Sequence, residues 1–348
     1  MKRIVVGNVE IGDGLPPLLI AEIGLNHNGS VQLAREMIDA AVQSGAHVVK
    51  FQKRTPDALA TAAFLDAPFQ KCPLFGRTQR EVRNRLEFTE SQLSDLKAYA
   101  AEKNVMFSMS VFDVPSLEIA LGLDLDFIKV ASHSVTNQPL LKAVAKTNKP
   151  VFFSMGASTW AERDAAFNCL KENPLVVLHC VSAYPCPDRL LKLNTIEKIR
   201  QRYDCVVGYS GHEVGILPSI IAASMGASVI ERHFTLNRSM VGLDHKLSLL
   251  PHEFAEMADN ISRVPNLMGE VDGIMSEELP SRTSYHVAVC TTRKLPKGHV
   301  MTADDVCCKQ PLGEPLKYYT GQQMHEVLGK TILQPIDSDQ PLPVSCVK

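Results

Sequence analysis

The sequence predicts an α/β fold, a (β/α)8 TIM barrel followed by a small β-rich domain, and three observations support this prediction. One unit recurs eight times in succession: a short apolar run, a polar or glycine-containing turn, and a stretch with helical periodicity. No G-x-G-x-x-G or phosphate-loop motif of an open nucleotide-binding sheet is present. The repetition then stops, and a shorter β-rich segment completes the 348 residues.

Each apolar run has the composition of a strand that is buried on both faces, as the strands of a parallel barrel are. The predicted strands begin at Leu18, His47, Val105, Asp126, Pro150, Leu175, Cys205 and Ser228. The intervening helical patterns often end at Gly or Asn, residues that favour helix termination. The second and third strands are the furthest apart, so residues 54–88 between them are predicted to form an inserted loop with some helix.

The domain boundaries follow from the point where the repetition ends. We expect the barrel in residues 1–270, a linker in 271–284 and the small β-rich domain in 285–348. The last barrel helix is expected near 251–264, ended by Pro265. A domain of about 60 residues lies near the lower limit for independent stability, so we expect it to dock on another surface.

The composition is that of a globular protein and argues against several functions. The formal net charge is −2, from 36 basic and 38 acidic side chains, so nucleic acid is not an expected partner. No apolar run reaches the roughly 18 residues that span a bilayer, and no signal-peptide core follows the N-terminus. We therefore expect a cytoplasmic protein with no membrane partner. The nine cysteines have irregular spacing and no C-x-x-C pair, which indicates reduced thiols and no cysteine-ligated zinc.

Polar residues gather at the ends of the predicted strands, where the βα loops of a barrel form the catalytic mouth. A single serine or histidine there is more often structural than catalytic, but polar residues end all eight strands. Two of them are lysines, Lys50 and Lys129, which follow apolar residues and need a buried counter-charge or a bound anion. Lysines together with several serine hydroxyls suit a phosphorylated substrate.

Two histidines, His212 and His233, end the last two strands of the barrel and could approach one divalent cation. Two nitrogen ligands with open positions describe a catalytic metal site. Glu22, on the first strand and therefore beside the eighth, could orient a metal-bound water or transfer a proton. Glu231 shares the face of His233 and lies deeper, whereas Arg232 is expected to face the helices in an ion pair.

Four motifs occur in order along the chain: IAEIGLNHNG, VSAYPCPD, GYSGHEVG and IERHFTLNRSMVGLDHKLSL. They resemble the signature segments of the sialic acid synthase (N-acetylneuraminate synthase) family, and they lie at the expected strand ends. The C-terminal module is similar to the antifreeze-like (SAF) domain of that family. The resemblance extends over nearly the whole chain, from about Ile4 to Leu342.

The resemblance implies a transferase that condenses phosphoenolpyruvate with an N-acylated aldohexose such as N-acetylmannosamine and releases phosphate. It implies that His212 and His233 bind a catalytic divalent metal, with Mn²⁺ expected first and Mg²⁺ or Co²⁺ as alternatives, and that Glu22 is the acid or base. The residues implied to bind phosphoenolpyruvate are Lys50, Ser110, Lys129, Ser132, Ser154, Ser182 and Ser210. The residues implied to bind the acceptor sugar, an N-acyl amino sugar, are Gln52, Tyr184 and Asp244. The family also implies a domain-swapped homodimer, in which each SAF domain covers the partner's barrel mouth.

Two departures from the family pattern concern the acceptor sugar. A carboxylate that sialic acid synthases carry after the fourth strand is replaced by Ser134, and an arginine before a proline in the SAF domain is replaced by Gln310. The acceptor could therefore differ from N-acetylmannosamine. Two alternatives stay open: a related synthase that makes another keto-sugar acid for a spore-coat or surface polysaccharide, and a carbohydrate-binding descendant without catalytic activity.

Overall fold

The chain divides into two compact units. The computed structural model describes residues 2–312 and 317–348, and the units are Met1–Met268 and Gly269–Lys348. Within the described residues, no helix is both long and apolar enough to cross a membrane.

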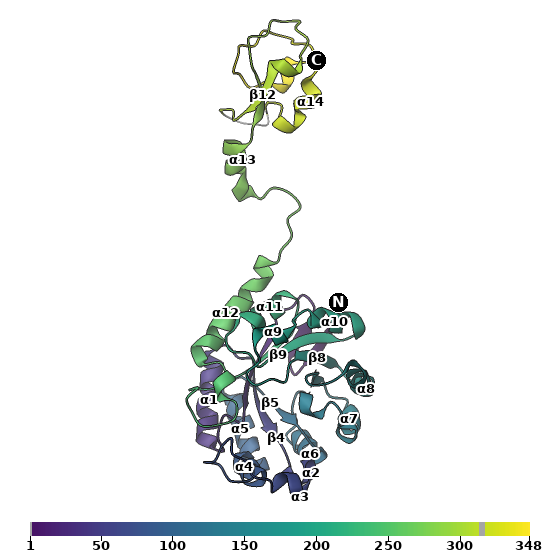
Figure 1. The fold of residues 1–348 in the computed structure, drawn as a ribbon, viewed down its shortest axis with the longest axis vertical. Coiled ribbons are helices and arrows are strands. Elements are labelled where there is room, and N and C mark those ends of the chain that lie inside the picture. Colours follow the sequence, from purple (N-terminus) through teal and green to yellow (C-terminus); the bar gives the residue numbers. More distant parts are fainter. Residues whose placement is uncertain (1, 313–316) are drawn as a thin grey trace. The chain divides into compact units, whose positions relative to one another are not determined.

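Eight parallel strands close into a barrel in the first unit, which confirms the predicted fold (Figure 1). Each strand pairs with its neighbours in sequence, and the last strand, β10, pairs with the first, β3. The strands are β3 Leu18–Gly24, β4 Val48–Lys53, β5 Met106–Val111, β6 Ile128–Val130, β7 Val151–Ser154, β8 Leu175–Cys180, β9 Val206–Gly211 and β10 Val229–His233.

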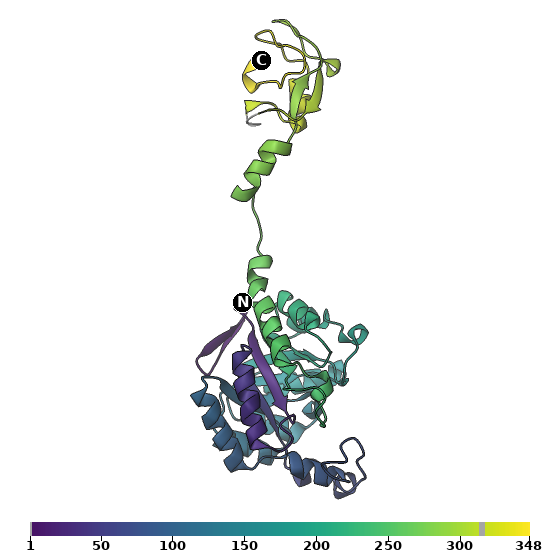
Figure 2. The ribbon, with the colours of Figure 1, turned by 90° about the vertical axis from the view of Figure 1, so that its left-hand side faces the viewer.

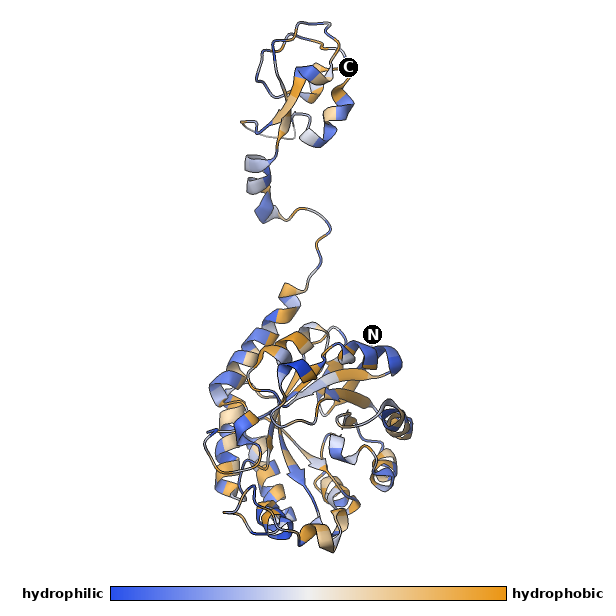
Figure 3. Cartoon of the chain, in the orientation of Figure 1, coloured by the Kyte–Doolittle hydropathy of each residue, from blue (hydrophilic) through white to orange (hydrophobic). Residues whose placement is uncertain are grey.

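Helices follow the strands, and they carry both hydrophobic and hydrophilic residues, as helices with one buried side do (Figure 3). They are α1 Val31–Gln43, α5 Glu90–Glu102, α6 Val114–Gly122, α7 Gln138–Ala145, α8 Trp160–Leu170, α9 Asp188–Leu191, α10 Thr195–Arg202, α11 Leu217–Ser224 and α12 Pro251–Leu267. Side-chain caps fix several helix starts; at α5 the Thr89 hydroxyl accepts a hydrogen bond from the Gln92 amide.

The expectation that Pro265 ends the last barrel helix is wrong, because α12 continues to Leu267. A proline lacks the backbone N–H of one helical hydrogen bond, but helix formation can resume after it. Here the Met268 amide donates to the Val264 carbonyl and closes one more turn. Pro265 therefore lies inside the final turn of α12.

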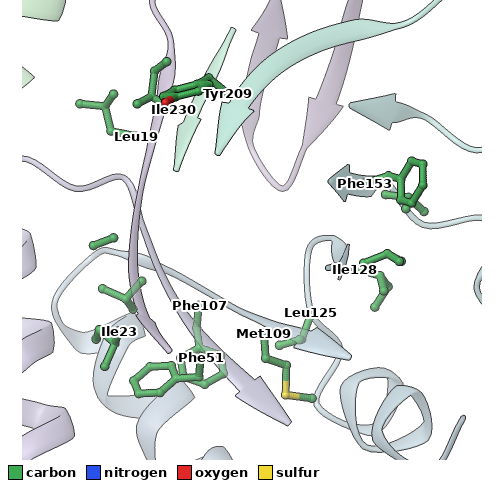
Figure 4. Packing of buried hydrophobic residues seen from close by; sticks show 14 of the residues in the cluster. Leu19, Ile23, Phe51, Phe107, Met109, Leu125, Ile128, Phe153, Tyr209 and Ile230 are labelled. Atoms are coloured by element: carbon green, nitrogen blue, oxygen red, sulfur yellow. The ribbon is translucent and has the colours of Figure 1, made fainter. Parts of the chain in front are cut away.

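Side chains alternate along each strand between the helices and the barrel interior. The outward residues pack with the helices into the main core, where the rings of Phe51 and Phe107 stack with centroids 5.1 Å apart (Figure 4). The inward residues near the strand starts form a second apolar cluster with Val6 and Ile11. These two belong to a hairpin at the N-terminus, drawn in purple in Figure 2, with strands β1 Arg3–Val6 and β2 Val9–Gly12. The apolar cluster forms the floor beneath the barrel mouth.

The inserted segment between β4 and α5 contains short helices, as expected. They are α2 Pro56–Leu59, α3 Ala62–Leu65 and α4 Gln79–Leu86. Val82 and Leu86 of α4 pack with Leu25, which follows β3, in a small separate cluster. This contact fixes α4 beside the carboxyl end of the first barrel strand.

The second unit contains a two-stranded antiparallel sheet and a small core of its own, in which Val289, Val306 and Leu342 are buried. Its elements are a 3-10 turn Ser276–Glu278, α13 Leu279–Tyr285, β11 Ala288–Thr291, β12 Val306–Lys309 and α14 Met324–Val327. The segment 271–284, expected as a linker, thus includes most of helix α13.

Candidate active site

The predicted site residues of the strands lie on the inward face, near the carboxyl ends. In β3 the inward series runs from Leu18 and Ile20, which are part of the apolar floor, to Glu22. In β4 Val48 of the floor is followed by Lys50. The same alternation places these residues inward on the other strands: Ser110, Lys129, Ser154, Ser210, Glu231 and His233. A polar layer therefore lies directly above the apolar floor.

Lys50 is buried and faces two carboxylates. Its ammonium group contacts Glu22 and lies 3.7 Å from a carboxylate oxygen of Glu231. It also donates a hydrogen bond of 2.9 Å to the Ser110 hydroxyl. The register of the barrel explains the first contact, because Glu22 and Lys50 lie directly opposite each other on β3 and β4. The charge of Lys50 is thus compensated inside the barrel.

Lys129 is buried on the opposite side of Glu231. It donates a hydrogen bond of 2.7 Å to the Ser154 hydroxyl and lies 3.7 Å from Glu231 Oε1. The Ser210 hydroxyl donates to the same oxygen at 2.9 Å. The sequence indicates Glu231 only as a deeper residue beside His233, whereas the structure places its carboxylate between the two lysines.

The two carboxyl groups of this cluster have pKa values shifted in opposite directions. Burial raises the pKa of Glu22 above its ordinary value, against the opposing charge of Lys50. Burial also acts on Glu231, but the charges of Lys129 and Lys50 outweigh it and hold the pKa of Glu231 below its ordinary value. Neighbouring carboxyl groups with separated pKa values are suited to different roles, one exchanging a proton and one staying ionised.

Two further serines lie beside Gly156, at the ends of β6, β7 and β8. The Gly156 amide donates a hydrogen bond of 2.8 Å to the Ser132 hydroxyl. A Cβ atom at Gly156 would clash with the Ser182 hydroxyl and lie only 2.7 Å from that of Ser132. Glycine at this position therefore allows the two hydroxyl groups to converge.

His212 and His233 come together at the ends of β9 and β10, with ring centroids 5.4 Å apart. His212 Nδ1 lies 2.8 Å from the Val181 carbonyl oxygen, which can only accept, so Nδ1 carries a proton and Nε2 remains for a metal. His233 Nδ1 is buried and has no hydrogen-bond partner within residues 2–312 and 317–348. Burial lowers the pKa of His233 well below its ordinary value, which favours the neutral ring.

Each imidazole thus presents a nitrogen suited to a divalent cation. Among the residues that the structure describes, no group of three or more His, Cys, Asp or Glu side chains forms a metal site. A cation on this imidazole pair would take its other ligands from substrate or water, as catalytic metals do.

The predicted sugar-binding residues border the imidazole pair and Glu22. The Tyr184 ring lies against His212, with centroids 4.1 Å apart, and 54% of Tyr184 is exposed. Asp244 approaches the other imidazole to 3.8 Å. Gln52 donates a hydrogen bond of 2.7 Å to the carboxylate of Glu22. The structure therefore places all three around the same barrel mouth.

Two polar side chains at the strand ends face away from the mouth. Arg232 forms an ion pair of 2.8 Å with Glu213 and donates to the Ser219 hydroxyl of α11, which confirms its expected orientation. His179, one of the polar residues at the predicted strand ends, lies 2.6 Å from the Leu191 carbonyl oxygen of α9. Val176 and Leu178 of β8 point into the barrel, so His179 points outward toward the helices.

The sequence does not indicate Arg54, although its guanidinium borders the mouth. Arg54 donates to Gln52 and lies over the Phe112 ring, 4.8 Å from its centroid. Arg54 directly follows a strand and lies within a polar run, and nothing in such a sequence distinguishes a residue of the site from an ordinary charged surface residue. Of the two departures from the family pattern, Ser134 is buried, and Gln310 is exposed in the second unit.

Comparisons with known proteins agree with this architecture. The N-acetylneuraminate-9-phosphate synthase of Drosophila melanogaster is 34% identical, over 93% of this chain and 94% of its own. The N,N'-diacetyllegionaminic acid synthase of Campylobacter jejuni is 32% identical, over 93% of this chain and 98% of its own. The crystal structure of N-acetylneuraminic acid (sialic acid) synthetase from Leptospira borgpetersenii, in complex with citrate, is 30% identical and has a TM-score of 0.70, covering 82% of this chain and 97% of that one.

The family models account for both units. The SAF domain model matches residues 286–348. The NeuB family model matches residues 37–273, which contain seven of the eight barrel strands and both histidines of the mouth. The chain therefore belongs to the NeuB family and ends in a SAF domain.

Proposed function

We propose that this protein is a nonulosonate (sialic acid type) synthase, which condenses phosphoenolpyruvate with an N-acylated aldohexose and releases phosphate. One observation carries the proposal: two buried lysines, two carboxylates and several serine hydroxyls lie beside an imidazole pair at the barrel mouth. The names of the Drosophila and Campylobacter relatives, both synthases of nonulosonic acids, support the same reaction class.

Phosphoenolpyruvate carries a phosphate and a carboxylate, which need cationic and hydroxyl donors. Lys50 and Lys129 supply the charge, and the serines supply directed donors. The residues proposed to bind phosphoenolpyruvate are Lys50, Ser110, Lys129, Ser132, Ser154, Ser182 and Ser210. Glu231 holds both ammonium groups in place between these hydroxyls.

In the proposed reaction, C3 of phosphoenolpyruvate forms a bond to the aldehyde carbon of the sugar, and the aldehyde oxygen takes up a proton. Water then adds at C2 and gives up one proton. The bond from C2 to the phosphate oxygen breaks with its electron pair going to phosphate, while the new C2 hydroxyl loses its proton and becomes the ketone carbonyl. Glu22, whose pKa is raised, lies between Lys50 and Gln52, where it can give or take these protons. Glu231 stays ionised because its pKa is lowered.

His212 and His233 would hold a divalent cation, for which we propose Mn²⁺, with Mg²⁺ and Co²⁺ as alternatives. When bound, such a cation supplies Lewis-acid polarisation of a carbonyl oxygen. The residues proposed to bind the acceptor sugar are Gln52, Tyr184 and Asp244, which surround the imidazole pair and Glu22.

Release of phosphate from phosphoenolpyruvate tests the proposal, with Mn²⁺ and a panel of N-acyl hexosamines that includes 2,4-diacetamido and 6-deoxy sugars. Wild-type protein should release phosphate with at least one acceptor, and Lys129→Met should release none. Lys149→Met is the matched control, because Lys149 pairs with the exposed Asp124 outside the mouth. No release with any acceptor, by protein that binds Mn²⁺, would overturn the proposal. The acceptor that is used distinguishes an N-acetylneuraminate synthase from a synthase of another keto-sugar acid.

We further propose a homodimer in which each SAF domain covers the barrel mouth of the partner, since a domain of about 60 residues benefits from a surface to dock on. Sedimentation over a range of concentrations should give twice the chain mass of 38.3 kDa. A monomer with full activity would refute this arrangement.

A further inference from the structure

Two cysteines face each other across the small sheet of the second unit, apart from every residue that the proposed reaction uses. In the register of β11 and β12, Cys290 lies directly opposite Cys307. Both carry free thiols. Residues that lie opposite each other in an antiparallel pair project to the same face of the sheet, so the two sulfur atoms share one face.

The backbone hydrogen bonds of β11 define the spacing of this cysteine pair. The Thr291 amide donates to the Gln340 carbonyl, on the side away from β12, whereas the Thr292 amide donates to the Asp305 carbonyl, on the side of β12. Since this direction alternates along a strand, Cys290 directs its backbone toward β12 and forms a hydrogen-bonded pair with the cysteine opposite. The Cα atoms of such a pair lie about 5.5 Å apart, within the range of about 4.4–6.8 Å that a disulfide needs.

The two thiols differ in their access to solvent. Cys290 is 3% exposed, whereas Cys307 is half-buried. Burial raises the pKa of the Cys290 thiol, and the proximity of Cys307 raises it further, because two adjacent thiolates repel each other. A reagent from solution therefore reaches Cys307 first, and Cys290 keeps its proton until it reacts in turn.

A lysine lies beside the cysteine pair on the same strand. Lys309 is two residues beyond Cys307 on β12, so its side chain projects to the face that carries both sulfur atoms. Its ammonium forms an ion pair with Asp339. That ion pair raises the pKa of Lys309, and the two cysteines act in the same direction, which places the ammonium within electrostatic reach of both. A nearby ammonium stabilises a thiolate, the form of cysteine that attacks a disulfide.

Cys308, the next residue along β12, projects to the opposite face. It lies opposite Val289, and its sulfur is 3.8 Å from the thioether sulfur of Met324. Cys308 is more exposed than Cys307, so exposure alone would make it the first thiol to react. Its position on the other face separates it from Cys290. Geometry and exposure thus predict different reactive cysteines.

We propose that Cys290 and Cys307 form a reversible disulfide by exchange with a low-molecular-weight disulfide such as glutathione disulfide. The Cys307 thiolate attacks one sulfur of glutathione disulfide, a mixed disulfide forms, and one glutathione leaves as a thiolate. Cys290 then gives up its proton and attacks the Cys307 sulfur, and the second glutathione leaves as a thiolate. Two protein thiols are oxidised, one glutathione disulfide is reduced to two glutathione thiols, and the protons pass to these thiols.

The link would join β11 to β12 and close the loop formed by residues 291–306. A disulfide across a loop of this size restricts the unfolded segment and so opposes separation of the two strands. β12 leads directly to Gln310, whose side-chain amide donates a hydrogen bond of 3.4 Å to the Tyr285 carbonyl at the end of α13. Oxidation would therefore stabilise the strand that carries Gln310.

The test exposes the full-length protein to glutathione buffers that range from reduced to oxidised, and then blocks the remaining thiols with N-ethylmaleimide. Mass spectrometry of unreduced peptides from wild type should show Cys290 linked to Cys307, and dithiothreitol should remove the link. Cys290→Ser should stop at the mixed disulfide, with glutathione on Cys307. Cys308→Ser is the matched control and should form the link as wild type does.

A second variant and a second readout guard against a folding defect in Cys290→Ser. In Cys307→Ser, where a half-buried thiol is replaced, Cys290 should stay a free thiol in oxidised buffer. Hydrogen exchange of the β11 amides should be about 10- to 100-fold slower in oxidised than in reduced wild type.

Three results would overturn the inference: a link through Cys308, wild-type Cys307 that keeps glutathione without passing it on, or wild-type Cys307 that stays reduced in oxidised buffer. Equal hydrogen exchange in linked and reduced protein would overturn the effect on the strand pair. Neither readout uses phosphoenolpyruvate or an acceptor sugar, so the result is independent of the proposed function.

Discussion

Replacing Glu231 by glutamine tests the charge balance on which the candidate site depends. Its carboxylate lies 3.7 Å from the ammonium groups of Lys50 and Lys129. At that distance and an effective dielectric constant near 20, each attraction amounts to about 4.5 kcal/mol. Lys50 keeps Glu22 in the variant, so the loss falls mainly on Lys129. Leaving one buried charge uncompensated typically costs about 3–5 kcal/mol, and we expect Glu231→Gln to reduce the free energy of unfolding by that amount.

Tryptophan fluorescence during urea unfolding reports on the barrel alone, because Trp160 on α8 is the single tryptophan of the chain. In phosphate-free buffer the free energy of unfolding of Glu231→Gln should be lower than that of wild type by about 3–5 kcal/mol. Saturating phosphoenolpyruvate should narrow the difference, because its anionic groups compensate the lysines. Glu197→Gln, at a partly exposed ion pair with Arg200, is the control and should change stability by less than about 1 kcal/mol. A similarly small loss in Glu231→Gln, or a difference that phosphoenolpyruvate does not narrow, would refute the reasoning.

Three further perturbations have defined outcomes. Gly156→Ala should push apart the two serine hydroxyls beside it and raise the Kd for phosphoenolpyruvate by about tenfold or more, measured by calorimetry; an unchanged Kd would contradict their convergence. Arg232→Met should lower the free energy of unfolding by about 3–5 kcal/mol because Glu213 is left buried without a counter-charge, and a loss below about 1 kcal/mol in urea unfolding would argue against this role. Burial lowers the pKa of His27, which stacks on Phe88, to about 3, so the folded state resists its protonation. Wild type should therefore lose stability as the pH falls below the ordinary histidine pKa of 6.5, by up to about 1.4 kcal/mol per pH unit from this group. The free energy of unfolding of His27→Phe, measured between about pH 6 and pH 4, should fall less steeply with decreasing pH than that of wild type. An equal dependence on pH in the two proteins would contradict the assignment.

The barrel and its polar mouth could be predicted from the sequence because both depend on local periodicity. In β4 the run VVKFQ alternates between outward Val49 and Phe51 and inward Lys50 and Gln52, so the strand and the direction of its lysine follow from one pattern. The same reasoning predicted the orientation of Arg232. For His179, the alternation alone is sufficient to place the ring outside the mouth.

Features that depend on register or on inserted segments could not be predicted in this way. Glu231 lies between two lysines because the closed barrel sets it opposite Ser210 and because long lysine side chains reach it from β4 and β6. The contact of Arg54 with Gln52 depends on how the chain leaves β4 to enter the insertion. No periodic pattern in the sequence indicates either arrangement, because tertiary packing alone determines both.

Calorimetric titration of phosphoenolpyruvate tests most directly the claim that the buried lysine and serine cluster is its binding site. Without acceptor sugar, wild-type protein should bind phosphoenolpyruvate, and Lys129→Met should weaken binding by about 100-fold or more because a charged donor is lost at a buried site. His212→Ala, at the imidazole pair, should lose turnover but still bind phosphoenolpyruvate. Binding to Lys129→Met as tight as to wild type would contradict the account.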